Sequence, residues 1–296
     1  MGTTVWVVAR SRQVEWARVR AQHVFETWES RLSRFRPQSE LSRLNGAGGR
    51  PVRVSRELFE VVFQAVRAAQ ATQGRFDPTL GRHLAQLGYD RSWEIVPPEQ
   101  AGPVPLIDRP SHNWQAVEMA WDTGTIRLPR GVWLDLGGIG KGMAVDAAVT
   151  DLKAAGVDPV MVNAGGDLAV SGHPPGGGPW PIGIGNEPYA AINLDAGGLA
   201  TSGLARRQWI RGGVRCHHLI DPATGVSVNN SLFRVTVAAP TAMQADVAAK
   251  VALISGPEAG KRFLLEVGLS GEMEWKDGTL DVVGRWPEER QTGGFA

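Results

Sequence analysis

The sequence predicts an α+β fold, and three observations lead to this prediction. Short segments with the apolar patterning of β-strands alternate with longer segments whose apolar residues recur every three to four positions, as in amphipathic helices. Of the 296 residues, 43% are hydrophobic and 21% are charged, a balance typical of a globular protein with a buried core. The sequence has no exact internal repeat, and no change of composition marks a linker. We therefore expect one packed unit over residues 1–296, built of two closely packed lobes.

The N-terminal part is predicted to form a strand and two helices. The strand covers residues 3–9 (TTVWVVA), which are rich in β-branched side chains. Ser11 is expected to open the first helix, and Ser55 to cap a second helix that ends before Gly74. Residues 36–51, between these helices, are expected to form a loop. The apolar residues that define the first helix are Val14, Ala17, Ala21, Val24, Phe25, Trp28 and Leu32.

The next part is expected to be irregular over residues 88–112, where prolines interrupt the chain. A hairpin follows, in which residues 114–121 pair with residues 126–128 across the turn sequence DTG at 122–124. Further on, residues 172–188 are rich in glycine and proline, which predicts an exposed loop.

Two short predicted strands each lead into a glycine-rich turn. A strand over 132–136 precedes the turn GGIG at 137–140, and a strand over 159–163 precedes the turn AGGD at 164–167. Such turns bring the backbone close to a ligand or simply redirect the chain, and the sequence leaves both interpretations open. Beyond residue 190, short strands alternate with two helices, and a hairpin closes the chain. These two helices are expected at about 241–255 and 257–267, and the hairpin turn at 276–278. An earlier helix, over residues 141–155, is expected to follow the turn at 137–140.

The turn at 137–140 is a candidate anion site. Backbone N–H groups at the start of a helix attract an anion, and Lys141 adds a positive charge. The segment is not a Walker A loop, because Gly142 stands where that loop requires Ser or Thr. Met143 likewise replaces the third glycine of a GxGxxG motif. A tight strand-to-helix connection without a ligand is the alternative.

Composition excludes several classes of protein. The net charge is +1, from 31 basic and 30 acidic residues, which argues against a nucleic-acid partner. The single cysteine, Cys216, excludes an intramolecular disulfide and an all-cysteine zinc site. No apolar run reaches the roughly 20 residues that a membrane-spanning helix needs. We expect a cytoplasmic protein, or an exported one whose signal has been removed.

Three further clusters are candidate site residues. His217 and His218 would face opposite sides of a strand, so one of them can enter a site, to move a proton or contact a phosphate; a hydrogen-bonded structural histidine is the alternative. Asp246 and Lys250 lie one helical turn apart, as in a simple ion pair, but their neighbours are apolar, which favours an inward, site-lining role. The remaining candidates are the turn FDPT at 76–79 and the polar cluster TSG at 201–203, both of which are also common in ordinary loops.

In combination and order, these motifs resemble the family of FAD:protein FMN transferases (ApbE, formerly called thiamine-biosynthesis lipoproteins). The resemblance covers about residues 1–256. The matching segments are 1–3 (MGT), 32–35 (LSRF), 39–45 (SELSRLN), 76–79 (FDPT), 135–146 (DLGGIGKGMAVD), 163–167 (NAGGD), 201–203 (TSG), 218–225 (HLIDPATG) and 245–246 (AD).

The resemblance implies an ApbE-like α+β fold related to the tunnelling fold, with FAD bound in a cleft between two lobes. It implies a transferase that moves FMN from FAD to a Thr or Ser hydroxyl of a partner flavoprotein, releases AMP and uses Mg²⁺. It assigns a catalytic role to His218 and Asp246, and metal ligation to Asp246 and the main-chain oxygen of Gly138. The FAD-binding residues implied by the resemblance are Met1, Ser33, Phe35, Asp77, Lys141, Gly165, Gly166, Thr201, Ser202, Gly203 and His218.

One position departs from the family pattern. The family has a metal-binding Thr four residues after the Asp that corresponds to Asp246, and here that residue is Lys250. The hypothesis is that the Lys250 ammonium replaces the metal ion, so that metal binding is weakened or absent. The alternative is that Lys250 extends away from Asp246 and leaves a partial metal site. The alternatives to a transferase are therefore a non-catalytic FAD-binding protein and an FAD pyrophosphatase, in which water replaces the acceptor hydroxyl.

Overall fold

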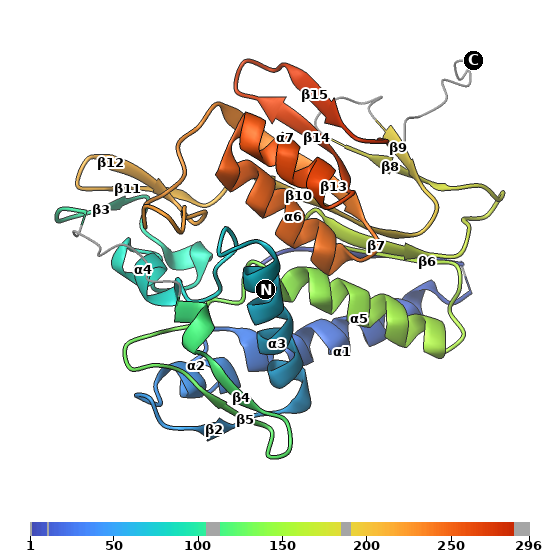
Figure 1. The fold of residues 1–296 in the computed structure, drawn as a ribbon. Helices are drawn as coiled ribbons and strands as arrows, with labels where there is room; N and C mark the ends of the chain where they lie inside the picture. The colour runs from blue at the N-terminus through green and yellow to red at the C-terminus, as the bar shows by residue number, and fades with distance from the viewer. Residues whose placement is uncertain (1, 11, 105–112, 185–190, 287–296) are drawn as a thin grey trace.

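A seven-stranded antiparallel sheet forms the centre of the computed structural model, which describes residues 2–10, 12–104, 113–184 and 191–286 (Figure 1). Among the described residues, the first strand lies at one edge of the sheet and the last at the other, so N-terminal and C-terminal segments belong to the same sheet. In spatial order the strands are β1 (Val5–Ala9), β6 (Val160–Ala164), β7 (Asp167–Ser171), β10 (Gly197–Gly203), β13 (Leu232–Ala239), β14 (Ser270–Trp275) and β15 (Leu280–Val283).

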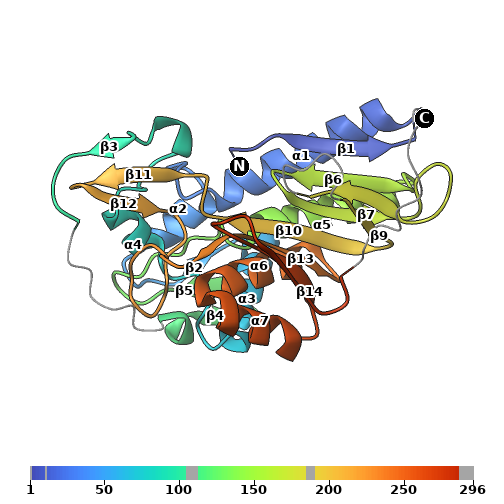
Figure 2. The same ribbon diagram turned by 90° about the horizontal axis from the view of Figure 1, so that it is seen from above.

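Four helices cover one face of this sheet (Figures 1 and 2). Alternate residues of β1, Val5 and Val7, pack with β6 and the first two of these helices, whereas Trp6 and Val8 between them are exposed. The other two helices pack on the remaining strands, so the main core lies between the sheet and its helices. The four helices are α1 (Val14–Leu32), α5 (Gly140–Ala154), α6 (Ala242–Ser255) and α7 (Pro257–Glu266).

A hairpin of β8 (Trp180–Gly183) and β9 (Ala191–Leu194) covers part of the opposite face. Leu168 and Val170 of β7 pack against this hairpin, and Ala169 between them packs against the helices. Strand β7 is therefore buried on both faces, which explains its continuous apolar run from Leu168 to Val170.

Smaller elements complete the molecule on the side of the helices. Figure 2 shows β3, β11, β12 and α4 together at one end, with β1, β6 and β7 at the other. The helical elements here are α2 (Glu40–Asn45), α3 (Arg56–Ala71), α4 (Gly81–Gln86) and the 3₁₀ turns Trp93–Ile95 and Asn113–Ala116. Two three-stranded sheets accompany them: β2 (Val52–Arg53), β5 (Thr125–Arg127) and β4 (Glu118–Ala120), and β12 (Val214–His217), β11 (Gln208–Arg211) and β3 (Glu99–Gln100).

The α+β class and most of the predicted elements are confirmed. Helix α3 has its N-cap at Ser55, whose hydroxyl accepts a hydrogen bond from the N–H of Leu58 at 3.2 Å, and Gly74 follows with a φ of 79°. Helices α5, α6 and α7 and the predicted C-terminal hairpin also form. Ser11 lies outside the described residues, and α1 begins at Val14. No helix in the described part of the chain is long and apolar enough to cross a membrane.

Three predictions about secondary structure are wrong. Residues 36–51 contain α2, which Ser39 caps by accepting a hydrogen bond from Ser42 at 2.9 Å; six residues are too short to show a helical period. Residues 132–136 form only an isolated bridge between Trp133 and Leu80. Residues 172–188 contain β8, in which the buried residues Trp180 and Ile182 flank the exposed Pro181.

Two further expectations hold only in part. Residues 114–116 of the predicted hairpin form a 3₁₀ turn, and only the residues of β4 pair with β5. Residues 88–112 are irregular except for a 3₁₀ turn and the two-residue strand β3, and residues 105–112 are not described.

Candidate functional site

A pocket of about 990 Å³ lies where α5, β10 and the smaller elements meet. This volume is at the upper end of the range for ligand pockets, which suits a molecule as large as a dinucleotide. The predicted site residues that line it are Ser33, Phe35, Asp77, Gly138, Lys141, Gly165, Gly166, Thr201, Ser202, Gly203 and His218. Lys250 lines it too, whereas Asp246 is buried behind Lys250. Met1 lies outside the described residues, and its neighbour Gly2 lines the pocket.

The start of α5 faces this pocket. Gly137, Gly138 and Gly140 line it, so the helix presents its N-terminal backbone there, as the glycine turn predicts. A Cβ on Gly138 would lie 2.9 Å from Cε2 of Phe76 and 3.5 Å from Cδ of Lys250. The absence of a Cβ at Gly138 therefore leaves room for the ring of Phe76, whereas the distance to Lys250 is that of an ordinary contact.

Lys141, in the first turn of α5, forms an ion pair with Asp167 at the start of β7. The Asp167 side chain is 1% exposed, and the lysine side chain is 20% exposed on the pocket wall. Burial lowers the pKa of Lys141, but the charges of Asp167 and Asp246 and the hydrogen bond to Asp167 outweigh it, so the pKa is raised. Lys141 is therefore an ammonium ion at neutral pH.

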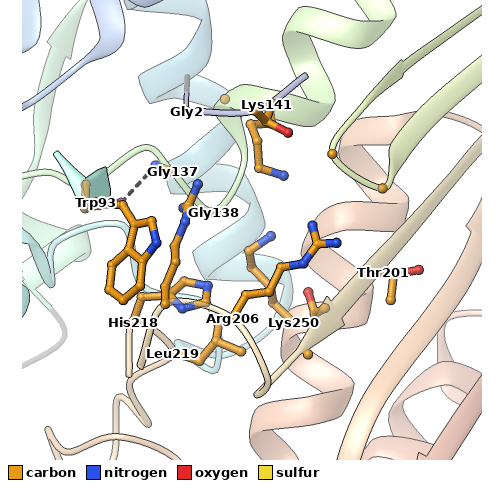
Figure 3. A pocket seen from close by; sticks show the side chains of 18 of the residues that line it. Gly2, Trp93, Gly137, Gly138, Lys141, Thr201, Arg206, His218, Leu219 and Lys250 are labelled. Atoms are coloured by element: carbon orange, nitrogen blue, oxygen red, sulfur yellow. Dashed lines mark hydrogen bonds between the residues drawn. The ribbon is translucent and has the colours of Figure 1, made fainter. Parts of the chain in front are cut away.

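Lys250 forms a second such pair with Asp246, one turn earlier on α6. The Asp246 side chain is 1% exposed and that of Lys250 is 12% exposed, so the prediction of an inward-facing pair is confirmed. Lys250 occupies one oxygen of Asp246, Oδ1, while Oδ2 is buried without a hydrogen-bond partner. Figure 3 shows that Lys141, Lys250 and Arg206 extend into the same part of the pocket.

The residues present do not fit a Mg²⁺ ion well. Magnesium prefers oxygen ligands, usually one or two carboxylates together with waters and phosphate oxygens, and the carboxylate that the resemblance assigns to it is that of Asp246. Lys250 places a positive charge on the one carboxylate that the resemblance assigns to the metal. The expected Mg²⁺ site is therefore not present in the form that the resemblance implies.

The two histidines take different roles, but not by alternation along a strand, because His217 is the last residue of β12 and His218 follows the strand end. His217 is structural, since its Nε2 pairs with the carbonyl of Val228 at 2.7 Å and its Nδ1 accepts a hydrogen bond from the N–H of Leu219. His218 lines the pocket, and its buried Nδ1 has no hydrogen-bond partner. Burial, followed by the charges of Arg207 and Lys250, lowers the pKa of His218 well below its usual value of 6.5. His218 is therefore neutral at neutral pH.

Several predicted binding residues also hold the local structure. Asp77 Oδ1 accepts hydrogen bonds from the N–H and hydroxyl of Thr79 at 2.8 and 2.5 Å, so the expected Asx turn forms and also lines the pocket. The Thr201 hydroxyl pairs with that of Thr236 on β13 at 2.9 Å. Gly165 and Gly166 have φ values of 66° and 106°, so both take the left-handed backbone that glycine allows.

A set of arginines and aromatic residues on the pocket wall is not indicated by any sequence pattern described above. The Arg34 guanidinium pairs with Asp135 and lies 4.1 Å from the ring centre of Phe35 and 4.9 Å from that of Tyr89. Its Nη2 is buried without a hydrogen-bond partner. Arg34 lies within a motif that carries the resemblance, but its type alone indicates no role. The other missed lining residues include Tyr89, Trp93, Arg206 and Arg207.

The fold and this pocket define an α+β protein with a large pocket lined by lysine, arginine and aromatic side chains, and comparison with known proteins identifies its family. The profile of the ApbE family matches residues 1–271, and the chain belongs to this family. It is 28% identical over 275 residues to the FAD:protein FMN transferase of Klebsiella pneumoniae, covering 90% of this chain and 79% of the relative. It is 31% identical over 253 residues to the protein of the same name in Treponema pallidum, covering 79% and 70%.

Solved structures agree with this assignment. The ApbE protein of Thermotoga maritima superposes with a TM-score of 0.82 at 25% identity, covering 95% of this chain and 94% of that one. The flavin transferase ApbE of Vibrio cholerae superposes with a TM-score of 0.76 at 27% identity, covering 96% and 94%.

Proposed function

We propose that this protein is an FAD:protein FMN transferase, which moves FMN from FAD to a Thr or Ser hydroxyl of a partner flavoprotein. The observation that carries the proposal is the arrangement of the start of α5, Lys141 and His218 around one pocket. The names of its relatives point to the same reaction. The acceptor hydroxyl oxygen forms a bond to the phosphorus of the FMN half, the bond from that phosphorus to the bridging oxygen breaks, and AMP leaves with that oxygen.

The start of α5 and Lys141 would hold the pyrophosphate. Phosphoryl transfer depends mainly on the positioning of groups and on neutralising the charge of the phosphate oxygens. The helix N-terminus supplies backbone N–H donors, and the Lys141 ammonium is held in place by Asp167. The aromatic wall of Phe35, Tyr89 and Trp93 is suited to a flat ring of FAD.

His218 would take the proton from the acceptor hydroxyl. A general base must be unprotonated before the reaction, and the lowered pKa keeps His218 in that form. The buried Nδ1, which has no hydrogen-bond partner, indicates a ring nitrogen without a structural task. Bound pyrophosphate is anionic and offsets the nearby cations, which raises the pKa of His218 and makes it a stronger base in the complex.

The test is incubation of the protein with FAD and a candidate acceptor domain. We expect flavin fluorescence on the acceptor band in a denaturing gel, together with AMP release, and loss of both in His218→Asn. The variant Arg127→Lys, at an exposed pair with Glu118, serves as a control that retains activity. AMP release without labelled acceptor would indicate a pyrophosphatase, and bound FAD without products a non-catalytic FAD-binding protein.

A further inference from the structure

Two lysine–aspartate ion pairs lie at the inner wall of the pocket, each formed by an ammonium group and a buried carboxylate. Lys141 and Lys250 come from different helices, and each is paired with an aspartate whose side chain is 1% exposed. The lysines line the pocket, whereas Asp167 and Asp246 lie behind them. The two pairs therefore present their lysine ends to the ligand.

Lys250 is held in place by its ion pair with Asp246. Its aliphatic stem lies beside Gly138, at a distance where a Cβ on that residue would lie 3.5 Å from Cδ and 3.6 Å from Cε. An ammonium group has three donors, and the pair with Asp246 uses one of them. Lys250 is thus a preorganised cation beside the start of α5, where the proposed function places the pyrophosphate.

We propose that Lys250 is the fixed cation of the pyrophosphate subsite, so that this protein binds FAD without a divalent metal ion. The inference rests on the proposed function for the identity of the ligand. The Lys250 ammonium donates hydrogen bonds to the phosphate oxygens and stabilises the negative charge that AMP carries as it leaves; it forms no covalent bond.

The same geometry disfavours a metal ion. A divalent ion near Asp246 would lie close to the ammonium of Lys250, and like charges repel strongly where water is excluded. Lys141 and Arg206 extend into the same part of the pocket and add to this repulsion (Figure 3). A metal would bind Asp246 only if Lys250 left it, which would leave the Lys250 ammonium without its counter-ion.

The first experiment uses the wild-type protein after removal of metal ions with a chelator. The quenching of flavin fluorescence measures FAD affinity with chelator and with excess Mg²⁺. We expect the same affinity under both conditions. Affinity that disappears with chelator and returns with Mg²⁺ would overturn the inference.

The second experiment compares variants of Lys250. Because a charge-assisted hydrogen bond is lost, Lys250→Met should weaken FAD binding roughly ten- to a hundredfold, with no recovery on addition of Mg²⁺. Lys250→Thr should lose similar affinity with chelator but recover with Mg²⁺, since it frees the Asp246 carboxylate and adds a hydroxyl oxygen. Lys250→Arg keeps the charge and should retain FAD binding with chelator even if the neutral variants fold poorly.

The matched control is Lys261→Thr on α7, which removes an exposed lysine paired with Asp281 on β15. It should behave as wild type. Binding of Mn²⁺, followed by electron paramagnetic resonance without FAD, gives a readout independent of activity. We expect Mn²⁺ binding in Lys250→Thr and none in wild type or Lys261→Thr; Mn²⁺ binding by the wild type as strong as that of Lys250→Thr contradicts the inference.

The two proposals fail in different ways. If FAD binds equally with chelator and with Mg²⁺ but no acceptor is labelled and no AMP appears, the transferase proposal fails and the role of Lys250 stands. If acceptor is labelled only when Mg²⁺ is present and FAD affinity also depends on Mg²⁺, the transferase proposal stands and the role of Lys250 fails.

Discussion

The side chain of Asp146 on α5 accepts a hydrogen bond at 2.8 Å from the backbone N–H of Ala242, the first residue of α6. The second oxygen of Asp146 accepts the N–H of Met243 at 2.9 Å. Next to this contact, a Cβ on Gly142 would lie 2.7 Å from the carbonyl oxygen of Ala242, so the two helices approach as closely as glycine allows. Since Lys141 is on α5 and Lys250 on α6, this contact sets the position of one ammonium group relative to the other.

Replacement of Asp146 tests this contact. Asp146→Ala leaves two N–H groups at the start of α6 without their acceptor, and we expect the free energy of unfolding to fall by about 1–3 kcal/mol. The free energy of unfolding should fall less in Asp146→Asn, because the amide oxygen of Asn still accepts a hydrogen bond. Urea unfolding followed by circular dichroism measures both variants. Equal stability of Asp146→Ala and wild type would show that the contact does not hold the helices.

Variants of the Lys141–Asp167 ion pair can distinguish a structural role of Lys141 from a role in binding FAD. Lys141→Gln leaves the Asp167 carboxylate buried without its counter-ion, and we expect a loss of about 3–5 kcal/mol in the free energy of unfolding. Adding Asp167→Asn should restore much of this stability, since no buried charge is then left alone. FAD affinity should stay low in both, because the ammonium is missing. Recovery of FAD affinity in the double variant would mean that Lys141 only neutralises Asp167.

Local sequence signals predict much of the fold, but they fail where contacts with distant parts of the chain determine the conformation of a segment. Helix α3 is predicted correctly because a capping serine and a helical period coincide within one segment. Residues 132–136 look like a strand, but the backbone N–H and carbonyl of Leu134 bond to the side chain of Asn45 at 2.8 and 3.0 Å, 89 residues away. No pattern within residues 132–136 reveals that partner.

The same distinction applies to the site. The apolar neighbours of Asp246 predict that it faces inward, and its side chain is 1% exposed. The partner of Lys141 is 26 residues away on another element, and Arg34 reaches Asp135 over 101 residues. Such pairs arise only when the chain folds, so residue type and spacing indicate the candidates but not their partners.

His218 should give the reaction an acid limit below pH 6.5. The pKa of His218 is lowered by burial and nearby cations, so the free protein keeps an unprotonated base at a pH where an exposed histidine is already charged. The pH profile of kcat/KM reports the free protein and should fall only below pH 6.5. The profile of kcat should fall at a higher pH, because bound FAD raises this pKa. A kcat/KM inflection at or above 6.5 contradicts the assignment.

The same shift predicts how stability depends on pH. Above pH 6.5 the histidine is neutral in the folded and unfolded chain alike and contributes no difference. Below 6.5 the unfolded chain binds a proton that folded His218 does not, so stability falls as the pH decreases toward the folded pKa. In urea unfolding, the stability of His218→Asn should fall less than that of wild type over this range. An equal fall in both would assign the pH dependence to other groups.

Arg34 offers a test of geometry at constant charge. Its guanidinium lies over the rings of Phe35 and Tyr89, pairs with Asp135 and leaves Nη2 buried on the pocket wall without a hydrogen-bond partner. Arg34→Lys keeps the positive charge but loses the planar fork and its stacking. Because a donor to the ligand is lost, we expect FAD affinity to fall by about two- to tenfold.

The control for Arg34 is Arg127→Lys, the same substitution at an exposed pair with Glu118. FAD titration at low and high salt separates charge from geometry, since salt weakens a purely electrostatic contribution. A weaker affinity of Arg34→Lys at both salt concentrations, with Arg127→Lys unchanged, would assign the effect to the orientation of the guanidinium. Unchanged affinity in Arg34→Lys would mean that Nη2 does not contact FAD and that Arg34 only holds Asp135 and the aromatic rings in place.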